Sequence, residues 1–143
     1  MMRWLVLAIM VLSGAGAHGQ VFQQSSFDTC FEDLADDASG AACIVPIRTY
    51  CFQVTEGRGF TAEATCLDDA ILSLEGWTDQ VVADHTHLAP LAPQISEYKT
   101  QLTAHCAETV GDRGLERERD FVLCKLAGVG ALYRDVLRRS ASP

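Results

Sequence analysis

Three histidines and a neighbouring aspartate are the side chains most typical of a metal centre in this chain. The run Asp84-His85-Thr86-His87 holds two imidazoles two residues apart, and His105 follows further along. Residues two apart on a helix point to different faces, so His85 and His87 would chelate one ion poorly. Zinc ligands usually follow other spacings. The pattern favours polar residues at a helix end, so we expect no metal and no other cofactor, with a metal-dependent hydrolase as the alternative.

Paired carboxylates are the other candidates for catalysis, and they occur at Asp36-Asp37 and Asp68-Asp69. A glycosidase needs two carboxyl groups that face each other across a cleft, whereas adjacent residues of a helix point apart. No Gly-x-Ser-x-Gly turn places a serine as nucleophile. We therefore expect no enzyme activity, and we interpret the four aspartates as candidate residues for binding a partner.

The N-terminus predicts export. Arg3 precedes the eight apolar residues 5–12, and the small residues Ser13 to Ala17 follow, which is the layout of a signal peptide. The apolar run is shorter than the roughly 20 residues that cross a membrane, and no later run is long enough to do so. We expect residues 1–19 to be removed and residues 20–143 to form one domain in the periplasm or outside the cell.

All six cysteines lie in the part of the chain expected to be exported. An even number there favours three disulfides over free thiols or metal ligands, with incomplete pairing as the alternative. Each neighbouring pair flanks one expected turn between helices, although connectivity cannot be deduced from sequence alone. The turns favour the pairs Cys30–Cys43, Cys51–Cys66 and Cys106–Cys124.

The spacing of apolar residues predicts an all-α fold, a small bundle of four to five helices stapled by disulfides. Pro46 is tolerated only in the first turn of a helix, so the second helix is expected to begin near Ile44 or Val45. A strand over residues 44–54 is the alternative there. Gly128 and Gly130 indicate a close helix crossing or a kink in the last helix. The expected helices cover residues 27–38, 41–53, 61–88, 94–109 and 115–138.

Acidic side chains dominate the first half of the expected domain. Removing Arg3 leaves 10 basic and 19 acidic residues, a net charge of −9. Residues 28–84 hold 12 acids against two arginines, a net charge of −10. This balance argues against binding to nucleic acid or anionic lipid and would attract a cationic partner. The alternative is a solvated acidic surface that only keeps the protein soluble.

The cysteine framework resembles the lysozyme inhibitor LprI N-terminal-like family of exported bacterial domains, over residues 27–137. The matching pieces are Cys30, Ala42-Cys43-Ile44, Tyr50-Cys51, the turn at residues 57–59, and Thr65-Cys66-Leu67. The chain looks like a divergent member, because only an aromatic, Tyr98, remains of the motif that usually precedes the fourth-helix cysteine. The resemblance implies a binding protein that inhibits lysozyme without catalysis. A structural or assembly factor of the cell envelope is the alternative.

Overall fold

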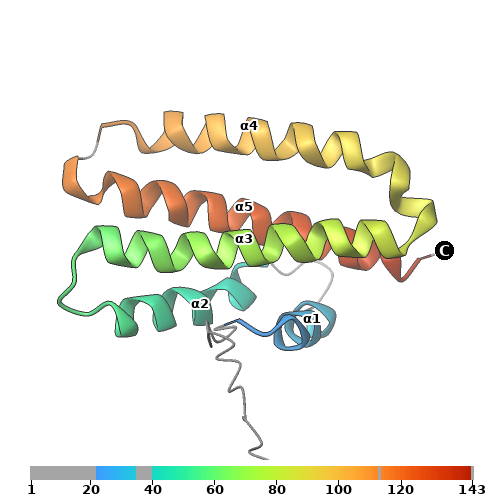
Figure 1. The fold of residues 1–143 in the computed structure, drawn as a ribbon, viewed down its shortest axis with the longest axis horizontal. Helices are drawn as coiled ribbons and strands as arrows, with labels where there is room; N and C mark the ends of the chain where they lie inside the picture. The colour runs from blue at the N-terminus through green and yellow to red at the C-terminus, as the bar shows by residue number, and fades with distance from the viewer. Residues whose placement is uncertain (1–21, 35–39, 113, 143) are drawn as a thin grey trace, which may run out of the picture.

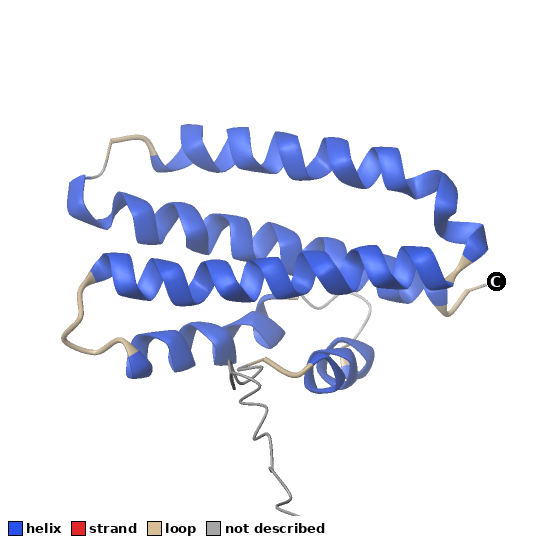
Figure 2. Cartoon of the chain, viewed as in Figure 1, coloured by secondary structure: helices blue, strands red, loops and turns tan. Residues whose placement is uncertain are grey.

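The computed structural model describes residues 22–34, 40–112 and 114–142, and its regular structure there is entirely helical (Figure 2). Residues 1–21, which include the expected signal peptide, lie outside the described residues. None of the described helices combines the length and the apolar character needed to cross a membrane. The α-helices are α1 (Gln24–Asp33), α2 (Ala41–Val54), α3 (Phe60–Asp84), α4 (Ala92–Val110) and α5 (Arg117–Ser140), with short 3-10 turns η1 (Thr86–Leu91) and η2 (Gly114–Glu116).

The two longest helices, α3 and α5, lie side by side and form the middle of the bundle (Figure 1). The helix α4 runs along the other side of α5, whereas α1 and α2 lie below the central pair. The expected all-α bundle of four to five helices is therefore confirmed in the described residues.

The core forms where the apolar stripes of α3 and α5 meet. Leu67 and Leu74 of α3 are fully buried, as is Leu126 of α5. Side chains of this kind contribute about 1.5–3 kcal/mol each when they leave water completely. Aromatic rings close the core beneath the central pair, where Phe27 and Phe31 of α1 pack close to Trp77 and Tyr133 respectively. The core thus includes all five helices, since Ile44 and Ile47 of α2 and Ile95 of α4 are also buried.

Several helix ends differ from the expectation, and α1 covers Gln24–Asp33 rather than residues 27–38. The helix α2 begins at Ala41 rather than near Ile44, and Pro46 lies inside it. Proline has no N–H, so the backbone hydrogen bond from position 46 to the carbonyl of Ala42 is missing. This missing bond falls near the start of the helix. The helix α3 ends at Asp84, and η1 then turns the chain so that Leu88 still reaches the core, with 3% of its surface exposed.

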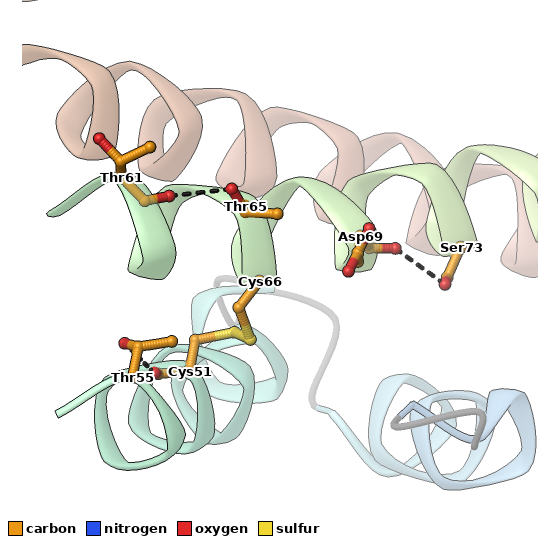
Figure 3. Close-up of a disulfide and its surroundings, with 7 residues drawn as sticks. All are labelled: Cys51, Thr55, Thr61, Thr65, Cys66, Asp69 and Ser73. Carbon is orange, nitrogen blue, oxygen red and sulfur yellow. Dashed lines mark hydrogen bonds between the residues drawn. A yellow bond between two sulfur atoms is a disulfide. The ribbon is translucent and has the colours of Figure 1, made fainter. Parts of the chain in front are cut away.

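Three disulfides join helices that follow one another in the chain. Cys30 of α1 bonds Cys43 of α2, with 5.9 Å between the Cα atoms. Figure 3 shows the next bridge, which ties Cys51 at the end of α2 to Cys66 near the start of α3. The last one, Cys106–Cys124, joins α4 to α5. These are the three neighbouring pairs predicted from the positions of the turns between helices.

The two glycines of α5 lie where other helices approach its backbone closely. A Cβ atom on Gly130 would lie 2.5 Å from Cδ1 of Ile44 in α2. A Cβ on Gly128 would meet the side chain of Leu102 in α4, which lies at 3.0 Å or closer. The expected close crossing is therefore confirmed, and α5 contacts a different helix at each glycine. Gly76 of α3, in contrast, has no atom near the place of a Cβ.

Candidate interaction surface

Of the four aspartates proposed for partner binding, Asp68 and Asp69 lie within the described residues. Asp36 and Asp37 lie outside those residues. Asp68 and Asp69 are exposed on α3, and successive residues of a helix point about 100° apart, so the two carboxylates face different directions. Asp69 lies one turn beyond Cys66, near the side of α3 that is bonded to α2 (Figure 3). Neither carboxylate has an ion-pair partner in the described part of the chain.

The described part of residues 22–84 is strongly acidic, with ten acidic against two basic side chains and a net charge of −8. Two of the acids are engaged with other helices. Asp79 pairs with Lys99 of α4 at 3.1 Å, and Asp28 accepts a hydrogen bond from Tyr133 of α5. Six others are exposed on α1, the turn after α2, and α3, and Glu75 of α3 is partly exposed. The six exposed acids are Glu32, Asp33, Glu56, Asp68, Asp69 and Asp84.

The fold keeps His85 and His87 close together, with 5.8 Å between their ring centroids, but it separates both from His105 in α4. The Nδ1 atom of His85 lies 2.8 Å from the carbonyl oxygen of Val81, to which it donates, and this contact closes the end of α3. His87 places Nε2 3.2 Å from the carbonyl oxygen of Arg139. His105 lies about 20 Å along α4 from its first residue, because a helix rises 1.5 Å per residue. Among the described residues, no three metal-ligating side chains come together.

A buried hydrogen-bond network joins the first helix to the last. Tyr133 is completely buried, its hydroxyl donates to Oδ1 of Asp28, and it accepts from Nε2 of Gln24 at 3.1 Å. Burial, followed by the hydrogen bond to Asp28, raises the pKa of Tyr133 well above its ordinary value. A neutral hydroxyl is therefore held at the centre of this contact. Its role is structural, because Tyr133 is closed off from solvent.

The helix α2 carries two apolar faces, of which only one is buried. Its inner face contains Cys43, Ile44, Ile47 and Cys51, which are all buried. We define the outward face of α2 as Ala42, Val45, Thr49 and Phe52, which are all exposed. Val45 and Phe52 keep 57% and 61% of their surfaces exposed.

The described residues also line grooves away from these regions. One of about 310 Å³ lies between α4 and α5, lined by Ile95, Tyr98 and Val136 and by the ion pair of Asp135 with Arg139. The charged atoms of that pair lie 2.8 Å apart and belong to one helix face.

We find no similar protein of known family or structure. The chain matches no family model, no curated protein and no solved structure.

The sequence located the exposed carboxylates of α3 but missed the outward face of α2. Asp68 and Asp69 are accessible, as a binding role requires. Tyr50 of α2 is also 38% exposed. The signal that could have revealed a second face is the 3, 4, 3 spacing of its four members, which is typical of a helix-packing seam.

Proposed function

We propose that this protein is an exported binding protein that acts by non-catalytic contact with a cationic protein such as lysozyme. The observation that supports this proposal is the acidic surface formed by α1, α3 and the turn after α2. The net charge of −8 over the described part of residues 22–84 includes exposed carboxylates without ion-pair partners, such as Asp68 and Asp69. The disulfides suit an extracellular or periplasmic location, because such bonds persist in oxidising compartments.

The acidic surface would act first on the rate of encounter. Complementary charge attracts a partner over a distance set by screening, which is about 8 Å at physiological ionic strength. Charge alone gives weak and non-specific attraction, so inhibition of an enzyme also requires a contact that blocks its substrate cleft. The resemblance to lysozyme inhibitors names the enzyme to be tested.

The test is lysis of bacterial cell walls by lysozyme with increasing amounts of the exported protein, at low and at high salt. We expect inhibition that weakens as salt rises. A variant with Asp36, Asp37, Asp68 and Asp69 changed to Asn should inhibit less well. The matched control carries four substitutions of equal charge change outside the acidic half, at the exposed residues Glu97, Glu108, Asp112 and Asp135.

Each outcome separates the alternatives. Inhibition that the aspartate variant loses and the control keeps supports the acidic half as the binding surface. Equal loss in both variants would mean that only the total charge matters. No inhibition at large molar excess in low salt would remove lysozyme as the partner and favour a structural or assembly factor of the cell envelope.

A further inference from the structure

The outward face of α2 is left uncovered by the described residues, although its pattern is that of a packed seam. Ala42, Val45, Thr49 and Phe52 follow one another at intervals of three, four and three residues. This spacing repeats on one side of a helix and is the pattern through which two helices pack against each other. A helix that is apolar on all sides is normally buried on all sides. In this chain α2 buries only the side that faces α3 and α5.

The charges on α2 favour a second copy of the chain over a cationic protein as the partner of this face. A surface built to receive a cationic protein should carry carboxylates, but α2 contains no acidic residue, and its one charged side chain is Arg48. The carboxylates lie on neighbouring elements, where they support the separate contact proposed above. Two copies of an acidic protein repel each other least where acids are absent, and α2 is such a segment.

The sizes of the side chains also suit self-pairing. The outward face begins with the small side chain of Ala42 and ends with the large side chain of Phe52. In an antiparallel pair around a two-fold axis, Phe52 of one copy packs against the Ala42–Val45 end of the other. Large side chains then meet small ones at both ends, which is the self-complementarity that a symmetric interface requires.

We infer that the outward face of α2 is a self-association surface through which two copies of this protein pair by antiparallel packing of their α2 helices. The helix is about 21 Å long. The exposed parts of Val45 and Phe52 amount to roughly 200 Å² for side chains of their size. A standard stable interface buries about 800 Å² per partner. The apolar area that this face offers is therefore well below that of a standard stable interface, so we expect the pair to be weak.

Sedimentation velocity of the exported, oxidised protein tests this inference over concentrations from about 1 μM to about 1 mM. The mass should rise toward that of a dimer with concentration. Phe52→Ser and Val45→Ser should each raise the Kd about tenfold or more, as the loss of a central apolar contact does. Leu72→Ser is the matched control, because Leu72 is 59% exposed but lies on α3. Circular dichroism checks that each variant keeps its helices.

Salt distinguishes this pairing from the binding of a cationic partner. Association of two acidic chains should strengthen as salt rises, whereas attraction to a cationic protein weakens. A protein that stays monomeric at about 1 mM overturns the inference, as does a dimer that Leu72→Ser weakens as much as Phe52→Ser. Lysozyme binding that requires Phe52 while the chain alone stays monomeric would assign the face to the partner instead.

Discussion

Replacing Gly130 by Ala tests how closely α2 crosses α5. The added Cβ would lie 2.5 Å from Cδ1 and 3.0 Å from Cγ1 of Ile44, which is itself buried. Real Cβ atoms do not approach other carbons so closely, so Ile44 or the helix that carries it must shift. Gly76→Ala is the control, since Gly76 also lies inside a long helix but has open space beside it.

The expected change in the free energy of unfolding is the balance of two effects. Alanine in place of glycine stabilises a helix interior by about 1 kcal/mol. Overpacking a buried contact costs about 1–3 kcal/mol. The steric effect should prevail at position 130, so we expect Gly130→Ala to destabilise the protein by about 1 kcal/mol. Gly76→Ala should stabilise it by up to about 1 kcal/mol, which separates the two variants by roughly 6–12 °C in melting temperature.

The measurement is urea and thermal unfolding of both variants with the disulfides intact. A double variant identifies the clashing atom, because Ile44→Val removes Cδ1 while keeping a β-branched side chain. Ile44→Val alone should cost about 0.5–1.5 kcal/mol. In that background Gly130→Ala should be less harmful than in the wild type. The reasoning is refuted if Gly130→Ala stabilises the protein as much as Gly76→Ala does, since α2 would then have room to move.

Two further predictions concern the contacts that hold the outer helices. Burial raises the pKa of Tyr133, so folding favours the neutral hydroxyl. The resulting contribution to the free energy of unfolding is complete below the pKa of tyrosine in the unfolded chain, about 10, and is lost as the pH rises above that value. Urea midpoints between about pH 9 and pH 11 should fall more steeply in the wild type than in Tyr133→Phe, and parallel curves would contradict this. Changing both Cys106 and Cys124 to Ala opens a link across 18 residues and should cost about 3 kcal/mol in the chain-entropy model. Hydrogen exchange should then show α4 losing protection before α3, because only three residues of α4 are buried; equal loss in both helices would contradict a local role.

The amino-acid sequence by itself determined the helical class and the approximate helix positions. Apolar spacing is local information, and in α3 and α5 it is long and regular enough to mark the buried side, as Leu74 and Leu126 illustrate. The turns between helices are also local, which is why they favoured the cysteine pairs that the structure contains. Helix ends were less predictable, as the start of α2 at Ala41 with Pro46 inside the helix illustrates.

Only the tertiary structure decided which groups from distant parts of the chain meet. Asp28 and Tyr133 are 105 residues apart in the chain, and nothing near either residue indicates the other. His85 and His105 separate because α4 runs away from the end of α3 along the bundle. The helix α2 is the clearest case, since both of its sides are apolar and its periodicity permits either to face inward. The disulfides at Cys43 and Cys51 and the space beside Gly130 select one side, and Val45 and Phe52 consequently remain exposed.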